Sequence, residues 1–170
     1  MDFLTTIEDE VASVADGGVL AAGTDHLYFV VGEEHYCADL ARIIKVVLLT
    51  ELRAVPMRPG YLTGLMNFGG TIVPVVDLAS RLRLDVSEPY DLTTPVIICM
   101  HDGREVGLVV TSVDQVIRVA DDEIQLAPMF EEQGPPCLGV VNRQGEQAFI
   151  LDLDRVLDVD LTHTDTEGEG

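Results

Sequence analysis

Positive charge is scarce in this 170-residue chain. Lys and Arg together number 10 against 30 Asp and Glu, the formal net charge is −20, and Lys45 is the only lysine. A protein that binds nucleic acid neutralises phosphates with Lys and Arg, and binding to anionic lipid needs the same charges. The composition therefore predicts no nucleic-acid partner and disfavours direct binding to lipid.

Long apolar runs are also missing. No stretch approaches the roughly 18 apolar residues that span a bilayer, and the first ten residues are acidic, without the basic start of a secretory signal. Hydrophobic residues still make up 47% of the chain, which argues against overall disorder. These features predict a soluble cytoplasmic protein that does not insert into a membrane.

Residues for metal binding and catalysis are few and scattered. Three widely spaced cysteines, an odd number, predict reduced buried thiols instead of a disulfide framework. The four histidines show no metal-ligand spacing, and no nucleophile elbow, phosphate loop or dinucleotide fingerprint occurs. We therefore expect no enzyme, metal or cofactor; an enzyme with a small-molecule site between two domains would need convergent polar groups there.

The excess of negative charge suggests a salt-rich setting. Such a surface repels itself in dilute buffer, whereas at molar salt the screening length falls to about 3 Å and the repulsion becomes tolerable. We therefore predict a halophilic protein of a high-salt cytoplasm. The alternative is an ordinary acidic protein, because net charge governs solubility and not fold.

The chain contains an internal repeat. The segment from Gly64 to Leu78 matches the segment from Gly139 to Leu153 at an offset of 75 residues, in the order strand, glycine turn, strand, aspartate. Each unit therefore predicts a hairpin followed by a short helix that the aspartate caps. The residues given this structural turn or cap role are Asn67, Gly70, Asp77, Asn142, Gly145 and Asp152.

The first part of each unit repeats at an offset of 70, so the second copy has five extra residues between 121 and 136. Five short strands per unit, separated by turn signals, predict a mainly β protein of two tandem five-stranded barrels. The expected organisation is a flexible leader over 1–25, a folded region over 26–158 and an acidic disordered tail over 159–170. Within the folded region we expect one barrel over 26–82, a connector over 83–94 and a second barrel over 95–158.

Two apolar features bear on partner binding. The run from Ile43 to Val47 is apolar on both strand faces except at Lys45, so one face needs a cover beyond its own barrel. Ile43 is either a partner contact or part of the core. Phe68 lies next to a glycine turn and is either packed locally or an anchor for a partner.

The order and spacing of these residues resemble the CheW family of chemotaxis coupling proteins. The resemblance runs from about Asp25 to Asp158. It is carried by three groups of residues: Tyr36 to Asp39 with Ile43 and Val46; Pro56, Pro59, Gly64, Asn67, Gly70, Pro74 and Asp77-Leu78; and Val106 to Val110, Val113, Val116, Leu138-Gly139 and Ile150 to Leu153.

The resemblance implies two packed SH3-like barrels and a non-catalytic adaptor that acts as a scaffold in signal transduction. Its partners would be the regulatory domain of a CheA-type histidine kinase and the cytoplasmic tip of chemoreceptors, at membrane-associated receptor arrays. It places Ile43, Gly64 and Gly69 at receptor-contact or coupling-sensitive positions. Lys45 lies nearby on the same strand as Ile43, and we add Phe68 as a candidate contact.

Three departures from the family pattern leave an alternative open. The family usually has an arginine where Gly69 stands, another where Ala79 stands, and an acidic residue where Lys45 stands. The alternative is a divergent CheW-like module for a non-chemotaxis kinase system, with weakened receptor binding. Restoring an arginine at Gly69 would distinguish the two.

Overall fold

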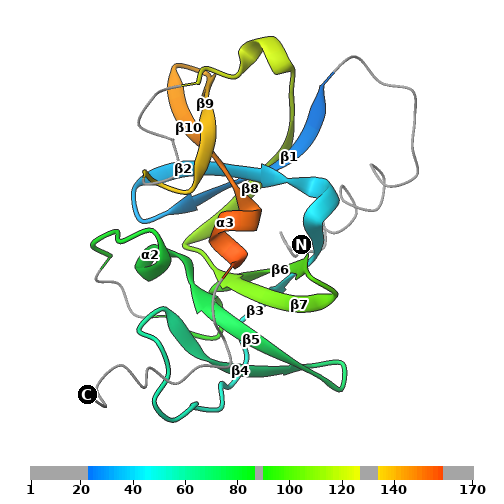
Figure 1. Ribbon diagram of the computed structural model, residues 1–170, viewed down its shortest axis with the longest axis vertical. Coiled ribbons are helices and arrows are strands. Elements are labelled where there is room, and N and C mark those ends of the chain that lie inside the picture. Colours follow the sequence, from blue (N-terminus) through cyan, green and yellow to red (C-terminus); the bar gives the residue numbers. More distant parts are fainter. Residues whose placement is uncertain (1–22, 87–89, 127–133, 159–170) are drawn as a thin grey trace.

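The computed structural model describes residues 23–86, 90–126 and 134–158, and shows a mainly β protein with two five-stranded sheets, as predicted. In Figure 1 one sheet lies in the upper half of the view and the other in the lower half, with the short helix α3 between them. The strands are β1 (Thr24–Val31), β2 (Glu34–Asp39), β3 (Ile43–Leu48), β4 (Leu62–Phe68), β5 (Thr71–Asp77), β6 (Pro95–His101), β7 (Arg104–Val109), β8 (Ser112–Val119), β9 (Cys137–Arg143) and β10 (Glu146–Leu151). The helical elements are η1 (Leu40–Arg42), α2 (Leu78–Arg81), η2 (Asp121–Glu123) and α3 (Leu153–Leu157).

The expected leader over 1–25 overlaps the first strand, because β1 begins at Thr24. The reason is that Thr24 and Asp25 pair with Val119 and Arg118 of β8, a contact distant in sequence. The rest of the leader up to residue 22, and the tail from 159, lie outside the described residues.

Three hairpins share one kind of two-residue turn. Both central residues have positive φ in each, which is the type I′ turn that matches the twist of paired strands. The three pairs are Gly69-Gly70 (58° and 87°), Asp102-Gly103 (49° and 75°) and Gln144-Gly145 (53° and 82°). Gln144 shows that a side chain can occupy the first position of this turn.

The strand order corrects the predicted division into sequential barrels. One sheet has the order β8-β1-β2-β10-β9 and the other β3-β6-β7-β5-β4, so each takes strands from both repeats. The second barrel is therefore continuous in sequence from β3 to β7, and the first is built from the two flanking parts of the chain. Adding five to each strand number, and subtracting ten where the sum exceeds ten, converts the first order into the second, so the repeat itself is real. Because the two copies are alike, the last three strands of each repeat, β3 to β5 and β8 to β10, exchange places without changing the fold of either barrel.

Each sheet curls until a single isolated bridge joins its ends. Arg53, beyond β3, exchanges two backbone hydrogen bonds with Leu65 of β4, with N···O distances of 2.8 and 2.9 Å. Gln125, beyond β8, does the same with Val140 of β9, at 2.8 and 2.9 Å. The closure is thus one residue pair wide and not a continuous ladder.

The main hydrophobic core lies between the barrels. It combines buried residues of both sheets and of α2 and α3, among them Phe29, Val76, Ile97, Leu108 and Val156. Each barrel also has a smaller cluster of its own. The large shared core joins the two barrels through a hydrophobic interface, and at about 25 cal/mol per Å² of apolar area it stabilises their relative placement.

The aspartates at the ends of β5 and β10 cap the two helices. Asp77 accepts a hydrogen bond from the Ala79 amide at 3.1 Å, and Asp152 accepts one from the Arg155 amide at 3.4 Å. Asp77 also accepts from the Tyr90 hydroxyl at 2.6 Å. Burial and this bond together raise the pKa of Tyr90 above its usual range. The connector is therefore tied to the helix that precedes it.

Candidate partner-binding surface

The thiols are buried and held protonated at neutral pH. Burial raises the pKa of Cys37 and of Cys99 to about 12 and that of Cys137 to about 11. A thiol becomes nucleophilic only as a thiolate, so these environments disfavour attack on a substrate. Within the described ranges, no group of three or more His, Cys, Asp or Glu side chains is placed to hold a metal ion.

Two of the residues predicted for partner binding meet at the end of the second barrel. Phe68 ends β4, packs on the inner cluster of this barrel, and lies under the ammonium group of Lys45, which is 5.5 Å from the ring centroid. Such cation–π contacts contribute about 0.5–1 kcal/mol at exposed sites. The aromatic ring is thus half-buried by local packing, with a cation over it.

Ile43 has a different environment from the one that partner binding requires. It is 7% exposed and belongs to the shared core, whereas Ile44 is 40% exposed. A register shift between Ile43 and Lys45 interrupts the alternation of β3, so Ile44 and Lys45 both face outward. On this strand, Ile44 and Lys45 therefore offer the surface, and Ile43 supports it from inside.

Gly64 lies at the barrel closure. A Cβ added to it would lie 2.8 Å from the Arg53 carbonyl oxygen, and Gly139 shows the same approach, 2.8 Å, to the Gln125 carbonyl oxygen. Glycine is needed here because two backbones meet. Gly64 therefore allows β4 to approach the backbone of Arg53 closely. Gly69 differs: it lies exposed in the hairpin turn, where an added Cβ would meet no atom within 4 Å. The turn is also held by Asn67, whose side-chain oxygen accepts from the Gly70 amide at 3.1 Å.

A groove of about 510 Å³ runs beside this hairpin on the outside of the second barrel. Its apolar lining includes Val55, Leu65, Pro74, Ile72 and Met100, and Arg104 and Glu105 add charge. Ile72 is 59% exposed and Met100 40%. Exposed apolar surface with a charged border is typical of a protein-docking surface.

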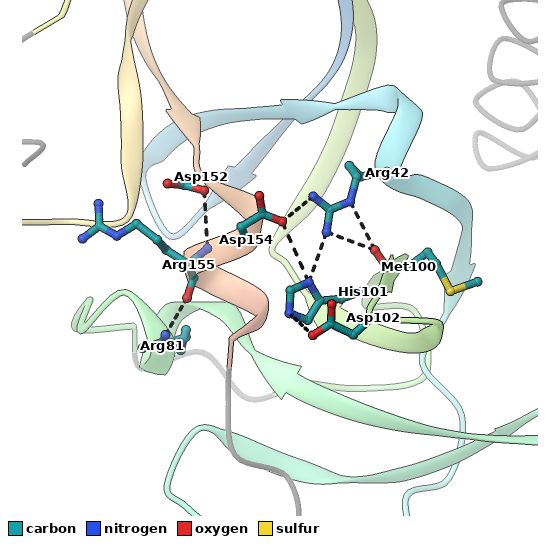
Figure 2. A network of polar contacts seen from close by, with 8 residues as sticks. All are labelled: Arg42, Arg81, Met100, His101, Asp102, Asp152, Asp154 and Arg155. Carbon is teal, nitrogen blue, oxygen red and sulfur yellow. Dashed lines mark hydrogen bonds and ion pairs between the residues drawn. The ribbon is translucent and has the colours of Figure 1, made fainter. Parts of the chain in front are cut away.

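A polar network joins the barrels next to the groove (Figure 2). Arg42, in η1 between β2 and β3, forms an ion pair with Asp154 of α3 at 2.7 Å and donates to the Met100 carbonyl at 3.2 Å. It also lies 3.2 Å from Nδ1 of His101. The Met100 side chain points away from this network in Figure 2. Met100 therefore contributes to the groove through its side chain and to the junction through its backbone.

Sequence reasoning missed Ile72, Met100 and Arg42. Ile72 and Met100 stand in β-rich runs that also hold many core residues. Which face of the sheet each side chain occupies depends on how its strand pairs with the next one. Arg42 precedes an apolar strand and contacts residues 58 and 112 positions away. The sequence does hold one local signal for η1, which is Asp39, an aspartate placed to cap a helical turn. In the structure its side chain accepts a hydrogen bond from the Ala41 amide at 2.9 Å.

The fold and this surface define a protein-interaction module built from two interlocked β-barrels. The sequence matches the CheW-like domain family over residues 25–160, and the chain belongs to that family. It is 27% identical to the chemotaxis protein CheW of Rhizobium meliloti over 136 residues, which cover 79% of this chain and 87% of that protein. It is 28% identical to the chemotaxis protein CheW of Bacillus subtilis over 141 residues, 82% and 90% of the two chains.

The fold has a counterpart among solved structures. The scaffolding protein TtCheW from Thermoanaerobacter tengcongensis superposes with a TM-score of 0.72 at 24% identity, over 81% of this chain and 94% of that one. This likeness extends over both barrels and supports the fold independently of the sequence match. Within the described part of the chain, no helix is both long and apolar enough to cross a bilayer.

Proposed function

We propose that this protein is a non-catalytic chemotaxis adaptor that couples chemoreceptor tips to the regulatory domain of a CheA-type histidine kinase at membrane-associated arrays. The family membership supports this role, and the apolar groove beside the β4–β5 hairpin is the observation that carries it. The hairpin and the groove face the receptor in this proposal, with Ile44, Lys45, Phe68 and Gly69 near the contact. The barrels form one rigid unit in this proposal because they share a core. A displacement of one barrel by a bound partner would therefore move the other.

The first experiment is a titration of the full chain with the kinase regulatory domain in molar potassium chloride. We expect a dissociation constant in the micromolar range or below. No binding by protein that circular dichroism shows to be folded in the same buffer would contradict the kinase part of the proposal.

A second titration, with a receptor cytoplasmic fragment, tests the groove. Ile72→Asp places a charge on its exposed apolar wall and should weaken receptor binding at least tenfold, since a buried charge without a partner is costly. Leu138→Asp is the matched control: Leu138 is 52% exposed on the other barrel, and its change should leave receptor binding unaltered. Equal losses in both variants would remove the groove from the proposal.

The missing arginine at Gly69 motivates the alternative, a module for a non-chemotaxis kinase system. Gly69 has φ +58° with open space around it, and the equivalent Gln144 has φ +53°, so Gly69→Arg fits the turn. The coupling role predicts that this variant binds the receptor fragment more tightly, because a guanidinium supplies several donors in a fixed fork. An unchanged receptor affinity together with retained kinase binding would favour the alternative.

A further inference from the structure

Three of the nine arginines line one cleft at the junction of the barrels. The cleft measures about 520 Å³ and is bordered by Arg81 and Arg83 after β5, by Pro135 and Pro136 before β9, and by Arg155 and Asp158 around α3. Its described lining thus carries three cationic groups and one carboxylate, in a chain of net charge −20. The described lining is therefore positive, against the sign of the chain as a whole.

Two of these arginines are fixed by backbone carbonyls. Arg81 donates to the carbonyl oxygens of Arg155 at 2.7 Å and Val156 at 3.1 Å, and its guanidinium lies 5.6 Å from the Tyr61 ring centroid. Arg155 donates to Gly134 at 2.7 Å and to Pro135 at 3.2 Å. Figure 2 shows Arg81 reaching the Arg155 carbonyl from below α3. These contacts fix the positions of both side chains, and the carbonyl oxygens orient the Arg81 guanidinium without cancelling its charge.

Arg83 is exposed and sits in an unfavourable backbone conformation. Its φ is +59°, at the end of α2, where its amide bonds to the Ser80 carbonyl at 3.1 Å and the Leu84 amide bonds to the Ala79 carbonyl at 2.8 Å. This is the Schellman motif, and its left-handed position normally takes glycine. A non-glycine residue there costs on the order of 1 kcal/mol. Among the described residues, no carboxylate forms an ion pair with Arg83.

We infer that this arginine cleft is a second docking site, which takes an acidic segment of a partner protein. The arginine forks suit carboxylates, which they bind through paired N–H donors. A nucleic acid would bring many phosphates against a chain of net charge −20, whereas a short acidic peptide can place its charge within this cleft alone. The strained arginine at a glycine position supplies charge at a cost to stability, a pattern found at functional sites.

The site also spans both barrels. Arg81 and Arg83 follow a strand of the second barrel, while Pro135, Pro136 and Arg155 belong to the first. A segment bound there touches both at once. This inference does not depend on the proposed chemotaxis role, and its test uses neither kinase nor receptor.

The test is a fluorescence anisotropy titration of the full chain with a labelled hexaglutamate peptide, with hexaglutamine as the neutral reference. Binding should be selective for hexaglutamate. Arg83→Gly should weaken it about three- to tenfold, the range for one exposed ion pair or charged hydrogen bond, while the melting temperature stays equal or rises because glycine relieves the strain. This opposite movement of binding and stability separates a binding role from a structural one.

Arg58→Gly is the matched control. Arg58 is exposed in the loop before β4, so this substitution removes the same charge at a position outside the cleft. It should change hexaglutamate affinity by less than Arg83→Gly does. Equal losses in the two variants would show a general charge effect and overturn the assignment. Absence of selective binding by the unmodified chain, or an Arg83→Gly variant with full affinity, would overturn it as well.

Discussion

At the scale of single residues, two pairs of glycines serve different purposes. Gly69 and Gly70 permit the positive φ of a turn, whereas Gly64 and Gly139 permit contact between two backbones where a sheet end is closed. The sequence repeat marks Gly64 and Gly139 as equivalent, and the equivalence extends to the carbonyl oxygen that each would clash with. The family resemblance predicts that Gly64 is coupling-sensitive, and this stays a prediction; the structure shows that a side chain there would displace the backbone at Arg53.

Gly64→Ala should lower the free energy of unfolding by about 1–3 kcal/mol, because its Cβ would lie 2.8 Å from a backbone oxygen that cannot move aside cheaply. Urea denaturation followed by circular dichroism measures the change. Gly60→Ala serves as the control, since a Cβ at Gly60 has no neighbour within 4 Å. Its effect should stay within about 0.5 kcal/mol, as for other open surface positions. Similar losses in both variants would rule out the steric explanation.

At the scale of elements, α3 is fastened to the second barrel at two points. Arg42 and His101 lie at its first turn, and Arg81 binds the carbonyls of Arg155 and Val156. His101 is largely enclosed, at 16% side-chain exposure, while Asp154 is 76% exposed. The Arg42 guanidinium is thus fixed mainly by the Met100 carbonyl and the His101 ring, with Asp154 as a solvated partner.

A double-mutant cycle of Arg42→Ala and Asp154→Ala measures this arrangement. Asp154→Ala should cost no more than about 1 kcal/mol of unfolding free energy, as for exposed ion pairs. Arg42→Ala should cost more, about 1–2 kcal/mol, because the hydrogen bonds to Met100 are lost as well. The coupling energy should lie at about 0.2–1 kcal/mol. Two single changes of equal cost would mean that the ion pair, and not the carbonyl contact, holds Arg42.

Most elements could be predicted from the sequence because each is a short β-rich run bounded by a turn pair such as Asp102-Gly103. Which strands pair could not be predicted, because β3 to β5 and β8 to β10 are copies and local patterns do not choose between two equivalent sets of partners. The sequence left Ile43 as either a partner contact or core, because the shift of register that places Ile44 and Lys45 both on the outside cannot be seen in a local pattern. Within the candidate site, Phe68 and Lys45 could be singled out from the sequence by their residue type and position, and their role stays a prediction. Ile72 and Met100 needed the neighbouring strands.

At the scale of the whole molecule, the acidic surface predicts a dependence on salt. Raising potassium chloride to molar concentration should raise the melting temperature, because charges farther apart than about 3 Å then no longer repel one another. Three acidic residues line one cleft of about 420 Å³, and neutralising them tests whether charge repulsion causes the salt dependence: Glu33, Glu34 and Asp85. The variant Glu33→Gln, Glu34→Gln, Asp85→Asn should melt higher at low salt and gain less from added salt. A melting temperature that falls or stays level would contradict the halophilic prediction.

The exchange of strands between repeats has a consequence for how the chain acquires its structure during synthesis. The second barrel is contained in residues 43–109, so all its strands are available while the remainder is still being made. The first barrel has only β1 and β2 at that stage and must wait for β8, β9 and β10. The emerging chain therefore carries the β1–β2 hairpin without its other partner strands, next to the complete second barrel. The hydrophobic face that will form the shared core stays exposed until translation passes α3.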